Sequence, residues 1–369
     1  VVIPKGVTKV DLYVFNGCTS LESVTIPTGV TKIFKQAFSG CSSLKSITIP
    51  EGVTHIDEWT FANCSALENI TLPNTVEEIG DDAFRGCTSL ENITLPDSIT
   101  QLGSNSFKDC TSLKNIALPK GLKRLERHTF ENCRALESVD LAGVKTIEAG
   151  AFVNCNSLKS IDLKKVSVLD DYAFVDAVGL ESIVIPGSVK SVGDNAFSKC
   201  TSLKSVVIER NVRTTTKLLD DVFFRCSALT TITIPKSVVL CKEKRGWLAT
   251  DAKDSIFYGC TSLKTVIGIE NVKFINESAF DGCALSGTIK LNSAVAIADY
   301  AFAGNRSLGS VILGESIQSI GEGAFANNSS LRTLTIKAPI YKLGKNAFSG
   351  CEALVEVSLN SAVIPSGAF

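Results

Sequence analysis

The sequence predicts a β-rich repeat solenoid of the α/β type, with one long parallel β-sheet on one side and short strands and turns on the other. A motif of about 23 residues recurs along the 369-residue chain, and each copy holds one short run of alternating apolar residues. A unit this short cannot enclose a core, so the next copy must cover its apolar face. We therefore expect a single solenoid over residues 1–369, with about sixteen repeats.

The clearest copy of the motif spans residues 38–50 and reads F-S-G-C-S-S-L-K-S-I-T-I-P. Its I-x-I pair has the period of two that is typical of a strand with one buried face, and the proline that follows ends the strand. A second short extended piece, V-x-x-I-G, follows in many copies, as in residues 76–80. The repeats are marked by Phe15, Phe38, Phe61, Phe84, Phe107, Phe130, Phe152, Phe174, Phe197, Phe223, Phe257, Phe280, Phe302, Phe325, Phe348 and Phe369.

The repeat length is irregular at two places. The step between repeat phenylalanines is 21 to 23 residues elsewhere, but it is 26 from Phe197 to Phe223 and 34 from Phe223 to Phe257. The extra residues predict insertions at 209–220 and 238–256, which should emerge as loops from one face. Both ends of the sequence fall inside a repeat, so we expect both ends of the solenoid to be uncapped.

Cysteine is a regular part of the motif. Twelve of the thirteen cysteines stand three residues after a repeat phenylalanine, and only Cys241 does not. No C-x-x-C pair is present, so the pattern favours a column of buried free thiols over disulfides or a zinc site. Ala177, Asn305 and Asn328 take the same slot in other repeats, and a buried asparagine there needs backbone groups of a turn as partners.

The repeat F-x-x-C-x-x-L-x-x-I-x-I-P, followed by V-x-x-I-G, resembles the BspA-type leucine-rich repeat family over essentially the whole chain. The resemblance implies a right-handed leucine-rich-repeat solenoid in which the cysteine takes an inward leucine position. It also implies a secreted or cell-surface protein of a bacterium or a parasitic protist, with adhesion to host or neighbouring-cell proteins. The chain lacks the asparagine that follows the strand in commoner leucine-rich repeats.

Composition and motifs argue against several functions. Lys plus Arg is 37 and Asp plus Glu is 38, so the net charge of −1 gives no footprint for nucleic acid. No apolar run is long enough to insert into a membrane, and no signal peptide is visible in residues 1–369. No catalytic or cofactor-binding motif is present, and the two histidines, His55 and His128, lie about three repeats apart. We expect a non-enzymatic protein without a cofactor or a metal.

The second insertion contains the strongest candidate contact residues. Trp247 is one of only two tryptophans, and Lys242, Lys244 and Arg245 accompany it in a loop that the repeat does not require. Tryptophan and arginine are enriched at interface hot spots, which predicts a partner-binding loop. The alternative is that Trp247 folds back and fills the lengthened turn.

Four residues in outward strand positions are further candidates for partner contact. Asp140 and Asp162 lie on adjacent repeats, and Val184 and Val207 form an apolar break in a face that elsewhere carries threonine. Two acids without a third ligand are weak evidence for calcium, and solvated side chains are the alternative for all four residues.

These observations favour an extended surface that binds another protein. The alternatives are a structural spacer or self-assembling module that stacks end to end, and the recognition arm of a larger protein with an enzyme elsewhere.

Overall fold

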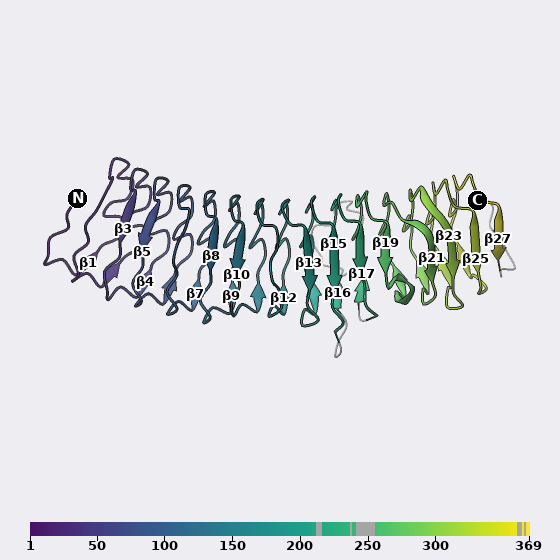
Figure 1. Cartoon of the computed structure of the whole chain (residues 1–369), viewed down its shortest axis with the longest axis horizontal. Coiled ribbons are helices and arrows are strands. Elements are labelled where there is room, and N and C mark those ends of the chain that lie inside the picture. The colour runs from purple at the N-terminus through teal and green to yellow at the C-terminus, as the bar shows by residue number, and fades with distance from the viewer. Residues whose placement is uncertain (212–215, 237, 241–254, 360–363, 365–366) are drawn as a thin grey trace. The chain divides into compact units, whose positions relative to one another are not determined.

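The structure is a computed structural model of the chain, and it describes residues 1–211, 216–236, 238–240, 255–359, 364 and 367–369. The chain divides into two compact units, Val1–Leu180 and Glu181–Phe369, and each is described by itself. Within each unit the repeats form successive coils of a β-solenoid, and every strand pair that the structure describes is parallel (Figure 1). The predicted β-rich parallel solenoid is therefore confirmed.

Each coil of the first unit contributes up to two short strands, one from each part of the motif. The I-x-I pairs form β3 (Ser46–Thr48), β5 (Asn69–Thr71), β8 (Asn115–Ala117) and β10 (Ser138–Asp140). The V-x-x-I segments form β1 (Lys9–Val10), β2 (Lys32–Ile33), β4 (His55–Ile56), β6 (Glu78–Ile79), β7 (Gln101–Leu102), β9 (Arg124–Leu125), β11 (Thr146–Ile147) and β12 (Val168–Leu169). Equivalent residues pair across neighbouring coils, as Ile47 does with Ile70.

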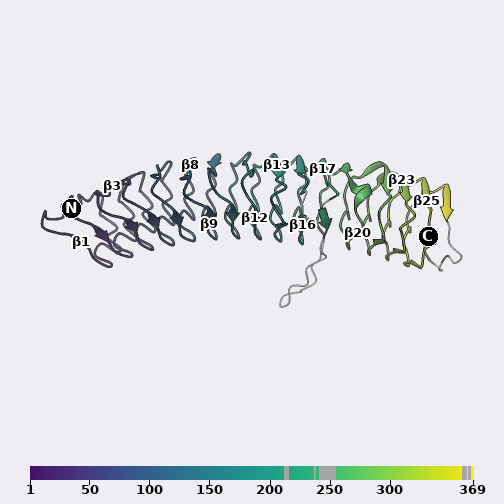
Figure 2. The same cartoon turned by 90° about the horizontal axis from the view of Figure 1, so that it is seen from below.

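The second unit follows the same plan, with the two sets of strands on opposite sides of each coil (Figure 2). Its I-x-I strands are β13 (Ser182–Ile185), β15 (Ser205–Ile208), β17 (Thr231–Thr233), β19 (Thr265–Ile267), β21 (Ser286–Leu291), β23 (Ser307–Leu313), β25 (Thr333–Ile336) and β27 (Glu356–Leu359). Its other strands are β14 (Ser191–Val192), β16 (Thr216–Leu218), β18 (Val238–Leu240), β20 (Phe274–Ile275), β22 (Ala296–Ile297), β24 (Ser319–Ile320) and β26 (Lys342–Leu343).

The single helical element among the described residues is a 3-10 turn, η1 (Ile269–Asn271), which follows β19. No helix in the described part of the chain is both long and apolar enough to cross a membrane.

A column of stacked phenylalanine rings fills the core of each unit. Neighbouring ring centroids are 5.0 to 5.7 Å apart in the first unit, from Phe15 to Phe174. In the second unit, from Phe197 to Phe369, they are 5.0 to 5.6 Å apart. Stacked pairs of this kind contribute about 0.5–1.5 kcal/mol each beyond the burial of apolar area.

The turns around each phenylalanine explain the small and polar residues of the motif. The residue two positions after the phenylalanine has a positive φ, as at Gly40 (73°), Asn63 (59°) and Gly86 (73°). Glycine adopts this left-handed conformation without strain, and asparagine and aspartate tolerate it better than other residues.

The cysteine column is buried as predicted, but its thiols also donate hydrogen bonds. Cys110 Sγ donates to the carbonyl oxygen of Phe84 in the preceding coil at 3.2 Å, and most regular coils repeat this bond. Each thiol thus provides a hydrogen-bond donor for a carbonyl oxygen that is buried between two coils. The cysteines that the structure describes are free thiols, and Cys241 lies outside the described residues.

Two cysteines depart from the predicted burial. Cys18 is exposed and Cys351 is half-buried. Cys18 stands in the first coil of residues 1–369, so it has no earlier coil in this sequence against which to pack.

The two asparagines in the cysteine slot bond to backbone groups, as predicted. Asn305 Nδ2 donates to the carbonyl of Phe280 at 2.8 Å, which is the bond that a cysteine makes in regular coils. Asn328 Nδ2 donates to the carbonyl of Phe302 at 3.0 Å in the same way.

Candidate binding surface

The outward face of the I-x-I strands in the first unit is polar. Thr48 and Thr71 face each other on β3 and β5, and both are exposed. Asn115 and Ser138 form the neighbouring row, in which Ser138 Oγ donates to Asn115 Oδ1 at 2.7 Å. This face is therefore mostly polar, except in the first coil, where the exposed Val2 is in register with Thr25.

The corresponding face of the second unit carries an exposed apolar row. Val184, Val207, Thr233 and Ile267 lie in register on β13, β15, β17 and β19. The exposed fractions of the three apolar residues are 49% for Val184, 42% for Val207 and 52% for Ile267. The sequence identified the two valines but not Ile267, although an isoleucine directly after the inward Val266 was a visible signal. We refer to Val184, Val207 and Ile267 as the apolar row.

Polar side chains border the apolar row. Ser182, Ser205 and Thr231 form the row beside it, on the same strands. At the beginning of these strands Lys204 Nζ and Glu181 Oε2 form an exposed ion pair at 2.9 Å. An apolar centre with a polar margin is the usual anatomy of a protein interface.

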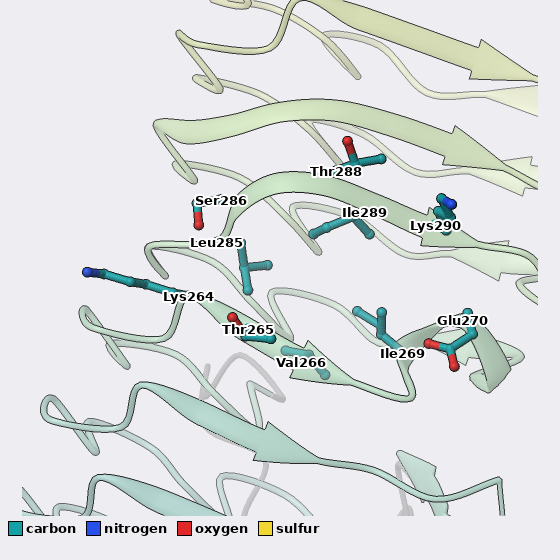
Figure 3. A pocket seen from close by; sticks show the side chains of 10 residues that line it. All are labelled: Lys264, Thr265, Val266, Ile269, Glu270, Leu285, Ser286, Thr288, Ile289 and Lys290. Atoms are coloured by element: carbon teal, nitrogen blue, oxygen red, sulfur yellow. The ribbon is translucent and has the colours of Figure 1, made fainter.

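A cleft opens at the end of the apolar row, between β19 and β21 (Figure 3). The four strands β13 to β19 form one sheet and the four strands β21 to β27 form another, and no ladder joins β19 to β21 among the described residues. The cavity between them has a volume of about 230 Å³, and Val266, Ile269, Leu285 and Ile289 line its apolar part.

The turn after β19 prevents the regular closure of this coil. Gly268 has a φ of 94°, where most coils have the second inward isoleucine or leucine of the I-x-I pair, and η1 follows it directly. A Cβ atom at position 268 would lie 1.9 Å from the carbonyl oxygen of Ile234, so only glycine fits this position. The chain therefore turns into η1 directly after β19 and places Ile269 at the cleft.

Asp140 and Asp162 serve the turns in which they stand. Asp140 Oδ1 accepts a hydrogen bond from the backbone N–H of Ala142 at 2.9 Å, and Asp162 Oδ1 accepts one from that of Lys164 at 3.0 Å. Both coils lack the usual proline and are one residue shorter, so the carboxylate closes the tighter turn. Both residues also line an open cavity of about 430 Å³ with Lys165, and their predicted role in partner contact stays a prediction.

The predicted loop cluster of Lys242, Lys244, Arg245 and Trp247 lies outside the described residues.

An aromatic pair that the sequence reading missed lies on the coils before and after this insertion. The rings of Phe224 and Tyr258 stack with their centroids 5.7 Å apart, and the guanidinium of Arg225 lies 5.0 Å from the Phe224 ring centre. The doubled aromatics Phe223-Phe224 and Phe257-Tyr258 were the available signal.

The histidines and the other potential metal ligands form small groups on separate coils. Within the described residues no three His, Cys, Asp or Glu side chains converge in a way that could hold a metal ion. The imidazole of His128 pairs with the Glu131 carboxylate at 2.9 Å, and that of His55 lies 3.6 Å from the Glu78 carboxylate. These pairs lie on separate coils.

Comparison with known proteins supports the same architecture. A family model described as "BspA type Leucine rich repeat region (6 copies)" matches residues 1–90, 77–204, 136–244 and 250–369. A leucine-rich repeat protein from Bacteroides ovatus is 29% identical, with a TM-score of 0.69 over 89% of this chain and 82% of that chain. No curated protein matches the chain.

Two further solved structures match the chain. A leucine-rich repeat protein of T. pallidum is 35% identical over 43% of this chain and 77% of that chain, with a TM-score of 0.41. A leucine-rich cell surface protein from Faecalibacterium prausnitzii is 23% identical over 92% of this chain and 84% of that chain, with a TM-score of 0.42. Leucine-rich-repeat proteins are typically non-enzymatic interaction scaffolds.

Proposed function

Because the chain belongs to the BspA-type leucine-rich repeat family, we propose that it is a non-enzymatic adhesion protein, secreted or held at the cell surface. Its partner is a protein of a host or neighbouring cell, or of the surrounding matrix. Leucine-rich-repeat solenoids generally bind proteins, and the net charge of −1 offers no attraction for nucleic acid.

The apolar row carries the proposal. Three exposed branched side chains stand in register on a face that is mostly polar elsewhere. Each is about half exposed, so burying the exposed half stabilises a complex by about 0.7–1.5 kcal/mol per residue. Hydrogen-bonded strands hold the row in place before a partner arrives, so binding orders little backbone.

The test is a binding assay on purified extracellular-matrix and cell-surface proteins, with the double variant Val184→Thr/Val207→Thr. Threonine already occupies this position in other coils, so the variant should fold, and we expect its affinity to fall by about tenfold or more. The matched control is Thr48→Val/Thr71→Val in the first unit, which should leave the affinity unchanged. Equal binding by wild type and the Val184/Val207 variant would show that the apolar row is not the surface that contacts the partner.

The same assay separates the alternatives. A spacer binds no protein on the panel, and a self-assembling module sediments as a larger species when its concentration is raised. Trp247→Ala tests the predicted loop contact, because loss of a tryptophan hot spot costs about 2 kcal/mol or more.

A further inference from the structure

We propose that the cleft between β19 and β21 receives an extended acidic segment of the partner protein, which adds as a β-strand to the two open strand edges. This inference rests on the proposed protein-binding function and deepens it, because it names the shape and the charge of what the partner presents.

The first argument is the direction of the backbone groups in β19. In a parallel ladder each residue directs its N–H and its C=O toward the same neighbouring strand, and successive residues alternate. Thr265 N–H donates to the Thr230 carbonyl and the Ile267 carbonyl accepts from Ile234 N–H, so both residues face the preceding coil. Val266, between them, therefore directs its N–H and C=O into the cleft.

The backbone of β21 offers the opposite edge. The carbonyl of Leu291 accepts from Gly314 N–H, so Leu291 and Ile289 face the following strand, β23. Ser286 N–H instead donates to the Lys264 carbonyl at 3.4 Å, on the side of β19. Gly287 has a φ of 72° and the register with β23 shifts between Gly287 and Thr288, so the direction of Thr288 follows from Ile289 and Leu291. By alternation with these two residues Thr288 directs its N–H and C=O toward the cleft. An unpaired strand edge is a ready template for an added strand.

The second argument is the size of the cavity. Its volume of about 230 Å³ lies below the range of about 300–1,000 Å³ that is typical of small-molecule sites. Val266, Ile269 and Ile289 supply an apolar wall that suits one or two side chains. A strand that alternates apolar and polar residues fits, since it turns one set of side chains inward while the other set stays in solvent.

The third argument is charge. Lys264 and Lys290 lie toward opposite ends of the cleft, and both side chains are exposed (Figure 3). Neither ammonium group forms an ion pair with any residue that the structure describes. The one carboxylate in the lining is that of Glu270, which accepts a hydrogen bond from Asn271 Nδ2 at 3.2 Å, so two ammonium groups and one carboxylate give the lining a net charge of +1. The site therefore favours carboxylates on the incoming segment.

The probe is a short fluorescein-labelled peptide of alternating valine and glutamate, added to the whole chain and followed by fluorescence anisotropy. We expect saturable binding that is about tenfold tighter than that of the matched valine–lysine peptide. N-methylation of the peptide backbone should weaken binding by about tenfold, because it removes the donors that pair with the strand edges.

Hydrogen exchange locates the peptide, since the amides of Val266 and Thr288 should exchange more slowly when it is bound. The variant Lys264→Glu/Lys290→Glu should reverse the preference from the glutamate to the lysine peptide. The matched control is Lys45→Glu/Lys114→Glu in the first unit, which should keep the preference for the glutamate peptide. Absence of saturable binding, equal affinity for both peptides, or unchanged exchange at Val266 and Thr288 would overturn the proposal.

The two proposals fail in different ways. If the glutamate peptide binds at the cleft but no surface or matrix protein binds the chain, the cleft assignment stands and the adhesion function falls. If a protein of the panel binds and the peptide does not, the adhesion function stands and the cleft assignment is wrong.

Discussion

The two asparagines of the cysteine column provide a matched pair of substitutions with opposite expected effects. In Asn305→Cys and Asn328→Cys the new residue is the one that the regular repeat uses, and both side chains are fully buried. In either variant the thiol can keep the bond to the phenylalanine carbonyl of the preceding coil, as Cys110 does. Both substitutions also remove an Nδ2 bond to the phenylalanine carbonyl of the same coil, that of Phe302 or Phe325, so the main difference between the variants comes from the amide oxygen.

The amide oxygens have different partners. Asn305 Oδ1 accepts the buried backbone N–H of Leu285 at 3.0 Å. Asn328 Oδ1 has no hydrogen-bond partner within the described part of the chain. A buried donor that loses its partner costs about 1–3 kcal/mol, so Asn305→Cys should lower the free energy of unfolding by that amount. Asn328→Cys removes an unsatisfied acceptor, so stability should stay unchanged or rise by about 1 kcal/mol.

Urea denaturation measures the global effect, and site-resolved hydrogen exchange measures the local one, which matters because repeat arrays need not unfold in two states. The Leu285 amide should exchange about 5- to 150-fold faster in Asn305→Cys and at the wild-type rate in Asn328→Cys. Equal destabilisation by both substitutions would refute the reasoning, since volume rather than hydrogen bonding would then control the slot.

Three further predictions concern the scaffold. Phe84→Ala should destabilise the chain by about 3–5 kcal/mol in urea denaturation, because the ring is fully buried between those of Phe61 and Phe107, with ring centroids 5.6 and 5.4 Å away. A loss of stability below about 1 kcal/mol would contradict the stacked core. Asp140→Ala should cost about 0.5–1.5 kcal/mol and Asp140→Asn less, because asparagine keeps the acceptor for the tight turn. Burial raises the pKa of Cys260 from 9.0 to about 12, so only the unfolded chain ionises this thiol between those values. Stability should hold below pH 9 and fall as the pH rises toward 12, and Cys260→Ala should make the fall less steep by the share of one thiol, because the other buried cysteines have raised pKa values too.

The fold was predictable because the same motif recurs along the whole sequence. Phenylalanine, leucine and the I-x-I pair recur at fixed spacing, and only one register stacks each of them on its equivalent in the next coil. The structure bears this out in the pairing of Ile47 with Ile70 and of Val184 with Val207.

The cysteine column was understood only in part from the sequence. Spacing indicated burial, but the direction of each Sγ depends on the coil before it, which lies 26 residues back for Cys110 and Phe84. The thiol is a hydrogen-bond donor as well as a small apolar group, which explains why asparagine replaces it twice.

The binding surface was predictable where one residue differs from the motif. It was not predictable where the spacing between motif residues within a coil differs. Val184 and Val207 stand out because threonine occupies their position elsewhere. The cleft depends instead on backbone geometry, namely the left-handed Gly268 and the separation of β19 from β21. The glycine in place of the second inward isoleucine was a visible signal, but the separation of the strands is not visible as a change of residue type.

The hydrogen bond of Asn305 to Leu285 and the cleft have the same cause, which is a leucine displaced by one position in the motif. In regular coils the leucine stands three residues after the cysteine and its N–H donates to the cysteine carbonyl, as Leu263 N–H does to Cys260 at 2.9 Å. Leu285 stands only two residues after Cys283, so its N–H turns to Asn305, and the strand that follows gains one residue before Ile289.

Moving Gly287 to a position between Ala284 and Leu285 restores the regular C-x-x-L-x-x-I spacing without changing the length of the chain. We expect β21 to shift toward β19, so that Val266 N–H finds a partner within the chain and exchanges more slowly without any peptide. The same variant should lose affinity for the valine–glutamate peptide. Unchanged exchange at Val266 would mean that Gly268 and η1 alone hold the cleft open.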